Sequence, residues 1–378
     1  MGNDGNIYIV SFIGSWLDEL SYYFKEIVYI GHQTKERKET QDYSILNKNK
    51  IKFYSTGEMG GILTLPLKVY RTRKKVKEIE KISDGLIVRA PTPRQGTILN
   101  AYKGKNKALY VVGEPIKKPF YHLLVKGQIK DLLLELLNRR RRMQTIKLLK
   151  SCVIISNSME LCKKYEEKLK RKTYFCPSSS LTENDFFFVE DRCQGQPLKL
   201  LFVGRVCRDK GILELIKAAK ILKKEGCNFI LNIVGSSGDA DKIEDFKKMS
   251  TMLELDDVIN WRGRVPFGKE LFKIYRMSDF LILPSAHEGF PRVVTESLAS
   301  GVLVLVTKVG GIKYVLEDKK DVYFIEKDPA SIVEAIKSLL ADSDLRKKMI
   351  KNGYIFAKKC LVDENARVMT EILEKEWL

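Results

Sequence analysis

Short apolar runs alternate along the chain with longer stretches in which apolar residues recur at helical spacing. The runs are rich in β-branched and aromatic residues, as buried strands are, and each is long enough for one strand. Strands that alternate with helices predict a parallel sheet with helices on both faces. In the first half we expect strands at 7–12, 27–30, 51–54, 86–88, 108–112 and 152–155, with helices at 63–82 and 158–170 among those between them.

A polar stretch up to Gln196, containing Pro177 and three serines, interrupts this pattern and predicts an interdomain linker. The pattern then starts afresh, with strands expected at 198–203, 229–234, 257–261, 280–283 and 302–306, helices at 211–224, 240–254 and 268–277, and a helical C-terminus.

The chain has 378 residues, which exceeds the size of a usual single core. We therefore predict two facing, doubly wound, Rossmann-like α/β domains, residues 1–190 and 191–378, with a C-terminal helix that could pack back on the first. Ligands bind such sheets at the carboxyl ends of the strands, so the site is expected in the cleft between the domains.

The charge is strongly positive, with 67 Lys and Arg against 48 Asp and Glu, a net +19. This excess predicts an anionic partner. The segment 116–150 alone has ten basic and two acidic residues, and four successive arginines at 139–142 lie beside leucines. We expect it to dock on an anionic membrane surface, the alternative being a core-packed helix with a solvated basic end. No nucleic-acid recognition module accompanies the charge, so nucleic acid is not an expected partner.

The cysteines and the apolar runs indicate the cellular compartment of the protein. The seven cysteines are scattered and form no C-x-x-C pair, which is typical of reduced thiols in a cytoplasm. We see no signal-peptide pattern, and no apolar run approaches the roughly 18 residues of a membrane span. A cytoplasmic protein, peripheral on the inner face of the membrane, is the expectation.

The stretch from Pro284 to Glu296 follows the expected strand at 280–283 and leads into a helical pattern. Glu288 and Glu296 are eight residues apart, about two helical turns, so both could face one pocket. Backbone N–H groups near Gly289 would lie at a helix N-terminus, which suits sugar oxygens or phosphate. A strand, loop and helix with two solvated glutamates is the plain alternative.

Two cations follow the strand at 198–203. Arg205 comes after Gly204, and Lys210 precedes Gly211 at the start of the next helical pattern. A guanidinium and an ammonium over a helix N-terminus would clamp a diphosphate, although in a basic protein both could simply be solvated. Gly235 ends the next strand, which is weak evidence alone.

Three further motifs are candidate anion or metal sites. Gly14 lies in the first expected strand-to-helix turn and is the favoured second phosphate contact. The glycines at 57–61 could cradle an anion, but turn chemistry explains them equally well. The D-x-D pattern at 239–241 begins an expected helix, where Asp is a common N-cap, so we expect no metal site there.

Taken together, several motifs in this order resemble the donor domain of the family-four retaining glycosyltransferases of the GT-B fold. The resemblance covers about residues 198–340 and rests on residues 204–205, 210–211, 233–235, 262–265, 278–279, 284–285, 288–296, 301 and 310–311.

The resemblance implies a role for several positions. Arg205 and Lys210 would hold the nucleotide diphosphate, with Gly204, Gly235 and Gly14 nearby, and Glu296 would accept hydrogen bonds from the ribose hydroxyls. Fixed cations would stabilise the leaving diphosphate without a metal or other cofactor. Glu288 would lie beside the transferred sugar, main-chain groups of Gly289, Phe290 and Pro291 would orient its hydroxyls, and Arg264 and Val265 would flank the nucleobase.

The first domain is less family-like. Arg89 and Glu114 follow two successive strands and resemble a subset of bacterial polysaccharide-assembling enzymes that have an acidic residue where many relatives have histidine. The chain has three histidines, at 32, 122 and 287. We take Arg89, Glu114 and His122 as acceptor-side candidates, with Glu114 as the polar group nearest the chemistry; alternatively, Glu114 is an ordinary loop residue. His287 could contact sugar or be an ordinary loop residue.

These expectations combine into one function: a retaining glycosyltransferase that moves a sugar from a nucleotide-sugar donor to a hydroxyl of a glycan or lipid-linked acceptor. Two alternatives remain: a nucleotide- or phosphoglycan-binding module without turnover, and a GT-B epimerase that acts on the nucleotide sugar itself.

Overall fold

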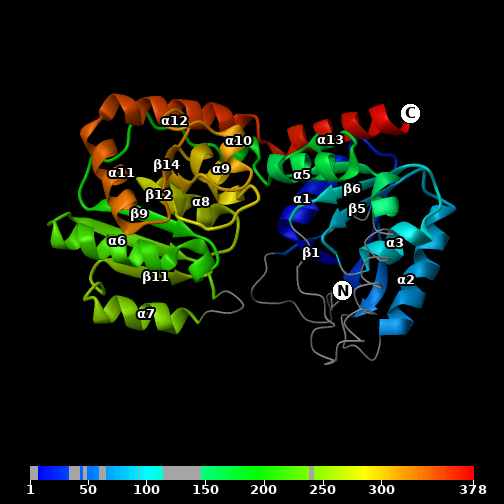
Figure 1. The fold of residues 1–378 in the computed structure, drawn as a ribbon, viewed down its shortest axis with the longest axis horizontal. Helices are drawn as coiled ribbons and strands as arrows, with labels where there is room; N and C mark the ends of the chain where they lie inside the picture. Colours follow the sequence, from blue (N-terminus) through cyan, green and yellow to red (C-terminus); the bar gives the residue numbers. More distant parts are fainter. Residues whose placement is uncertain are drawn as a thin grey trace.

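The computed structural model describes residues 7–33, 43–45, 49–58, 65–92, 94–113, 146–237 and 242–378. These residues form two α/β lobes side by side, with the N-terminal half of the chain in one and residues from about 181 to 361 in the other (Figure 1). Each lobe contains a parallel sheet, as predicted.

The C-terminal lobe contains a six-stranded parallel sheet with the order β11-β10-β9-β12-β13-β14. Numbered from the first strand of the lobe, this order is 3-2-1-4-5-6, that of a doubly wound Rossmann sheet. From β9 the chain adds β10 and β11 on one side, and it then adds β12, β13 and β14 on the other side of β9. The boundary between β9 and β12 is therefore the topological switch point of the sheet. The strands are β9 (Leu198–Val203), β10 (Phe229–Val234), β11 (Ile259–Gly263), β12 (Phe280–Leu283), β13 (Leu303–Thr307) and β14 (Tyr323–Ile325).

Helices lie between these strands and bury the sheet on both faces. All four residues of β12 and all five of β13 are buried, which is why their sequences are continuously apolar. The helices of this lobe are α6 (Ile212–Lys224), α7 (Ile243–Met252), α8 (Lys269–Arg276), α9 (Arg292–Ala299), α10 (Ile312–Val315), α11 (Pro329–Ala341) and α12 (Ser343–Lys358), with two 3₁₀ turns, η3 (Glu183–Asp185) and η4 (Arg208–Lys210).

The N-terminal lobe departs from a single predicted sheet, since its described strands fall into three sheets. One is a parallel four-stranded sheet, β5-β6-β7-β8; β2 and β4 form a parallel pair, and β1 and β3 an antiparallel pair. The strands are β1 (Tyr8–Val10), β2 (Ile27–Gln33), β3 (Tyr43–Ile45), β4 (Ile51–Glu58), β5 (Leu86–Ala90), β6 (Lys107–Val111), β7 (Val153–Ser156) and β8 (Tyr174–Phe175); the helices are α1 (Ser11–Leu20), α2 (Leu65–Glu80), α3 (Gln95–Ala101) and α5 (Met159–Leu169).

The last helix, α13 (Val362–Trp377), leaves the C-terminal lobe and lies against the N-terminal one (Figure 1). Its buried residues Ala366, Met369 and Leu373 share a core cluster with Leu20 of α1 and Tyr110 of β6. The apolar face of α13 is therefore part of the first lobe's core.

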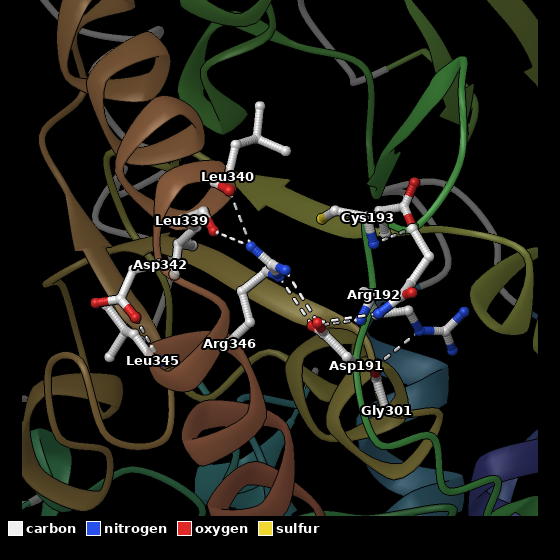
Figure 2. A network of polar contacts seen from close by, with 11 residues as sticks. Asp191, Arg192, Cys193, Gly301, Leu339, Leu340, Asp342, Leu345 and Arg346 are labelled. Carbon is white, nitrogen blue, oxygen red and sulfur yellow. Dashed lines mark hydrogen bonds and ion pairs between the residues drawn. The ribbon is translucent and has the colours of Figure 1, made fainter.

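The segment that leads into β9 is fastened to the C-terminal lobe by a buried ion pair (Figure 2). Arg346 of α12 binds Asp191 with two hydrogen bonds, of 2.8 Å to Oδ1 and 2.9 Å to Oδ2. Its third nitrogen, Nη1, donates to the carbonyl oxygens of Leu339 and Leu340 at the end of α11. Burial alone would raise the pKa of Asp191, but the guanidinium of Arg346 holds that pKa below its usual value.

The neighbouring Arg192 extends this network to the ends of two more helices. Its guanidinium donates to the carbonyl oxygens of Arg276 at 2.6 Å, Ser300 at 2.8 Å and Gly301 at 3.1 Å. Residues 191–192 are thus tied to α8, α9, α11 and α12, and they fix where β9 begins.

Candidate active site

Two loops meet at the switch point of the C-terminal sheet, between β9 and β12. One follows β9 and runs from Gly204 through η4 to Gly211; the other follows β12 and begins at Pro284. Gly211 has φ = 75°, and a Cβ there would lie 2.1 Å from the carbonyl oxygen of Pro284. Only glycine allows this close approach, which places both loops at the carboxyl ends of adjacent strands, where ligands bind doubly wound sheets.

An ion pair joins the two loops. Lys210 Nζ lies 2.6 Å from Glu288 Oε1, and the side chains are only 14% and 8% exposed. Ser285 Oγ donates to the same carboxylate oxygen at 2.8 Å, and Thr307 Oγ1 donates to the Ser285 carbonyl at 2.6 Å. The structure thus brings together two residues that lie 78 positions apart and that the sequence assigned to one site. A mostly desolvated ion pair of this kind places a fixed cation and a fixed acceptor at the sheet edge.

A third loop, after β13, supports the backbone around Glu288. Gly311 N–H donates to the Gly289 carbonyl at 2.6 Å. Gly310 has φ = 58°, and a Cβ there would lie 1.8 Å from the Glu288 carbonyl oxygen. The two glycines therefore allow the β13 loop to pass directly behind residues 288–289.

Gly204 and Gly235 lie next to each other at the same edge of the sheet. The Gly204 N–H donates to the Val234 carbonyl at 3.0 Å, and a Cβ on Gly235 would lie 1.8 Å from the Gly204 carbonyl oxygen. Arg205 follows Gly204 and is exposed, and no hydrogen bond or ion pair to the rest of the described chain holds its guanidinium. The accessible guanidinium belongs to the same loop as Lys210.

Glu296 has surroundings quite different from those of Glu288. It lies on α9, is 3% exposed, and accepts a 2.8 Å hydrogen bond from the hydroxyl group of Tyr275 on α8. Burial raises the pKa of Glu296, while Arg292 and the Tyr275 hydroxyl act to lower it. The prediction that the two glutamates lie two helical turns apart is wrong, because α9 begins only at Arg292 and Glu288 lies in the preceding loop.

The other donor-side candidates flank this edge. Pro291 is the N-cap of α9 and has no N–H group. Phe290 is 6% exposed, with its ring centroid 6.3 Å from that of Phe356. Of these two residues, only the main chain of Phe290 could therefore donate a hydrogen bond. Arg264 and Val265 follow β11; both are half-buried, and Val265 packs against the core.

His287 is exposed, and its Nδ1 lies 3.0 Å from Asp209 Oδ1, so it pairs with the β9 loop.

One donor-side prediction is corrected by the structure. Gly14 lies inside α1 and is buried, instead of in a turn, because β1 ends at Val10 and the helix begins directly at Ser11. As the fourth residue of a helix, its N–H belongs to the intrahelical hydrogen-bond pattern and is not one of the free N-terminal groups that bind phosphate.

On the acceptor side, Arg89 is placed at the end of β5, with an exposed surface. Desolvation by the surrounding protein lowers the pKa of its guanidinium; Tyr110 and Tyr29 oppose this shift, and the charge of Arg292, from the other lobe, adds to it. Glu114 and His122 lie outside the described residues.

Other predicted segments also fall outside the described ranges in whole or in part. Residues 114–145, which contain most of the basic segment, and the D-x-D pattern at 239–241 are outside, as are residues 59–64 after the glycine at 57. Within the described ranges, no group of His, Cys, Asp or Glu side chains is arranged to hold a metal ion. Of the described helices, none is both long and apolar enough to cross a membrane.

Sequence reasoning missed three side chains that the structure adds to the site. Thr307 is a polar residue at the end of an apolar strand, a signal that could have identified it. Tyr275 and Arg292 gave no such signal, since Tyr275 occupies a core position of an amphipathic helix and Arg292 one of many basic positions.

Comparison with known proteins agrees with this geometry. Residues 184–356 match the family model described as "Glycosyl transferases group 1". A lipopolysaccharide 1,2-N-acetylglucosaminetransferase of Salmonella typhimurium is 34% identical over 187 residues, which cover 47% of this chain and 48% of that protein. The matches span about two-fifths of the length of the first curated relatives, from 38% to 43%.

Solved structures share the whole two-lobed fold. A glycosyltransferase from Rickettsia africae superposes with a TM-score of 0.70 at 18% identity and covers 97% of this chain and 95% of that one. Anabaena Alr3699/HepE, solved in complex with UDP-glucose, gives a TM-score of 0.63 at 15% identity, with 86% of each chain covered. The paired loops at the switch point thus lie within residues 184–356, which match the group 1 model, and the chain shares the GT-B fold of these solved structures.

Proposed function

We propose that the protein is a retaining glycosyltransferase that moves a sugar from a nucleotide-sugar donor to a hydroxyl group of a glycan or lipid-linked glycan acceptor. The observation that carries the proposal is the Lys210–Glu288 pair, which joins two loops at the switch point of a group 1 domain. Assembly of a cell-surface polysaccharide is the proposed context, since a matched relative is a lipopolysaccharide N-acetylglucosaminetransferase.

The cations of the β9 loop are proposed to bind the donor's diphosphate. Arg205 is accessible and would bind phosphate oxygens in a fork, while Lys210 adds a point charge. As the bond between the anomeric carbon and the diphosphate oxygen breaks, negative charge accumulates on the diphosphate, and both cations stabilise it more in the transition state than in the ground state. This arrangement supplies the stabilisation without a metal ion or other cofactor.

Glu288 is proposed to bind hydroxyl groups of the transferred sugar. Before the donor arrives, its Oε1 is occupied by Lys210 and Ser285. A diphosphate beside Lys210 would compete for the ammonium group, and the carboxylate would then accept hydrogen bonds from sugar hydroxyls. Donor binding would thereby exchange one set of charge-assisted hydrogen bonds for another, which limits the cost of desolvation.

The acceptor hydroxyl is proposed to attack from the same face that the diphosphate leaves. A new bond forms between its oxygen and the anomeric carbon, the proton passes to a leaving diphosphate oxygen, and the anomeric configuration is retained. Arg89, at the end of β5 in the other lobe, is proposed to contact the acceptor.

The acceptor is proposed to be reached from an anionic membrane surface at the cytoplasmic face. Helix α2 adds to the basic segment 116–150, since six of its sixteen residues are Lys or Arg. Its Leu67 and Tyr70 are 51% and 64% exposed, which gives the basic helix apolar contacts for a bilayer interface. Co-sedimentation with liposomes that contain anionic lipid should be strong at low salt and weak at high salt; equal binding to neutral liposomes would contradict the proposal.

Transfer is tested with a panel of UDP-, GDP- and dTDP-sugars and glycan acceptors, by following release of nucleoside diphosphate. We expect release that depends on acceptor and falls at least about a hundredfold in Arg205→Ala, because a preorganised charge contact is lost. The surface variant Lys320→Met is the control. Binding without turnover would favour a binding module, and interconversion of two nucleotide sugars without acceptor would favour an epimerase.

A further inference from the structure

Two buried hydroxyl groups form a short relay that ends on Glu288. Thr307 Oγ1 donates to the main-chain carbonyl of Ser285 at 2.6 Å, and Ser285 Oγ donates to Glu288 Oε1 at 2.8 Å. The serine and the threonine are 0% and 3% exposed. A carbonyl oxygen and a carboxylate that is paired with a lysine have no proton to give, so both hydroxyl groups are the donors and the direction of the relay is fixed.

The backbone of residues 285–289 is held from both sides. The Ala286 N–H, on one side, donates to the carbonyl of Asp209 in the loop after β9 at 2.8 Å. On the other side, the Gly311 N–H in the loop after β13 donates to the Gly289 carbonyl at 2.6 Å. These bonds fix the backbone, so the remaining freedom of the glutamate between them is that of its own side chain.

Lys210 and Ser285 hold the same oxygen of Glu288, but they differ in what else they can bind. The lysine ammonium ends a flexible aliphatic stem, whereas the serine hydroxyl is attached to the backbone through one buried carbon. A diphosphate carries more negative charge than one carboxylate, so it would draw the ammonium away from Glu288. Among the described residues, Ser285 would then keep Oε1 in place, and the position that the ammonium leaves on this oxygen could accept a sugar hydroxyl.

We propose that Ser285 and Thr307 are positioning residues that hold Glu288 in place once the donor's diphosphate has taken up Lys210, so that this relay sets the discrimination between donor sugars that differ at one hydroxyl group. The inference rests on the proposed function, because it presumes a sugar beside Glu288. A carboxylate fixed in one orientation matches a hydroxyl group in one configuration. In the epimer that hydroxyl points elsewhere and leaves a mostly buried carboxylate without this partner, which a hydrogen-bonding site rejects strongly.

The relay also joins two loops, since Thr307 is the last residue of β13 and Ser285 follows β12. A purely structural role is therefore the alternative, and the two roles differ in their effect on a nucleotide without a sugar. Disordered loops would weaken the binding of nucleoside diphosphate and of nucleotide sugar alike, because Lys210 is paired with the same segment. Loss of orientation at Glu288 would weaken only the recognition of the sugar.

The test uses pairs of nucleotide sugars that differ in configuration at one carbon: UDP-glucose with UDP-galactose, UDP-N-acetylglucosamine with UDP-N-acetylgalactosamine, and GDP-mannose with GDP-glucose. Calorimetry gives the Kd of each member and of UDP or GDP alone. In Ser285→Ala we expect the wild-type preference for the better member to fall about tenfold or more, which corresponds to one hydrogen bond to a charged group. Binding of UDP or GDP alone should stay within about twofold of the wild-type value.

A second pair of variants keeps the test valid if Ser285→Ala fails to fold. Thr307→Val keeps the shape of the side chain and removes the hydroxyl that fixes the Ser285 carbonyl, so the preference should fall about threefold or more. Thr307→Ser retains the hydroxyl and should retain most of the preference. Ser250→Ala is the matched control and should keep the wild-type preference, because Ser250 is 1% exposed in the same lobe and donates to a main-chain carbonyl at 2.7 Å.

The outcomes separate this inference from the proposed function. An undiminished preference in both Ser285→Ala and Thr307→Val, or a wild-type protein that binds both members of every pair equally, would overturn the positioning role and leave the transferase intact. Equal weakening of free nucleotide and nucleotide sugar would also overturn it, because the relay would then only fasten the two loops. If no nucleotide sugar of the panel bound the wild-type chain, the proposed function would fail and the inference with it.

Discussion

Replacement of Lys210 by methionine perturbs the contact on which the proposed site depends. The lysine lies 2.6 Å from Glu288, and the side chains are 14% and 8% exposed. Methionine keeps most of the aliphatic length and removes the charge. The variant therefore leaves a mostly buried carboxylate whose remaining partner, Ser285, is neutral.

The magnitude follows from that burial. Removing one partner of a fully buried ion pair costs about 3–5 kcal/mol, because the other charge is left uncompensated. Partial exposure and the Ser285 hydrogen bond reduce this, so we expect about 2–3 kcal/mol. For a lobe of this size that corresponds to a fall in Tm of about 5–10 °C. The exposed pair Lys320–Glu317 is the matched control, and Lys320→Met should leave Tm nearly unchanged, because a solvent-exposed ion pair contributes little to stability.

A double-mutant cycle separates the structural from the catalytic role of the pair. Glu288→Gln in the Lys210→Met background removes the stranded charge, so the double variant should regain most of the lost stability. Its transfer activity should nevertheless stay at least about a hundredfold low, since the diphosphate still lacks its cation. Thermal unfolding and a coupled assay for released nucleoside diphosphate measure the two effects. If the double variant regained activity together with stability, the assignment of Lys210 to the diphosphate would be refuted.

Three further predictions concern the framework of the site. Asp191→Asn should destabilise the C-terminal lobe by about 3–5 kcal/mol at neutral pH, because the buried guanidinium of Arg346 loses its counter-ion. The pKa of Asp191 is lower in the folded protein than in the unfolded chain, so its stabilising effect is fully present above the unfolded pKa of about 4 and is lost as the pH falls through the folded pKa. The free energies of unfolding of wild type and variant, measured in urea, should therefore converge in acid. Gly211→Ala should lower the free energy of unfolding by more than about 3 kcal/mol. The control Gly226→Ala, at a similar φ of 76° but with open space around it, should lower it by about 1 kcal/mol. Equal losses of stability would show that the close approach at Gly211 is unimportant. Met369→Ala in α13 should cost about 2–5 kcal/mol, with increased hydrogen exchange in the N-terminal lobe, and exchange confined to α13 itself would contradict its place in that core.

The C-terminal lobe could be predicted closely because its apolar runs, its glycines and the order of its elements all indicate the same fold. Its expected strands at 198–203, 229–234 and 280–283 have the bounds found in the structure. Continuous apolar runs identify strands buried on both faces, and the glycines after them mark where loops must approach closely. The order of the strands places Lys210 near Glu288, since both follow strands on either side of the switch point.

The N-terminal lobe was predicted less well, for reasons visible in particular residues. The apolar run at 7–12 forms a strand only over Tyr8–Val10, because Ser11 already begins α1, and this moves Gly14 from a turn into a helix. Periodicity cannot separate so short a strand from the helix that follows it. The division of the described strands into three sheets depends on pairings between distant segments that local patterns do not contain.

The partners of individual side chains were the least predictable part of the site. Spacing in the sequence could not show that Glu288 lies in a loop while Glu296 is buried against Tyr275, because both facts depend on where α9 begins and on how α8 packs against it. The different environments of the two carboxylates, one paired with a lysine and one anchored by a tyrosine, emerge only from the packed structure.

The stereochemistry of transfer tests the proposed mechanism most directly. Proton NMR would follow wild-type protein with a nucleotide sugar chosen from the donor panel and a glycan acceptor, and would record the first anomeric signal of the product. We predict acceptor-dependent consumption of the donor and a product with the same anomeric configuration as the donor, both lost in Lys210→Met. A product of inverted configuration, or no consumption of any nucleotide sugar across the panel, would contradict the account.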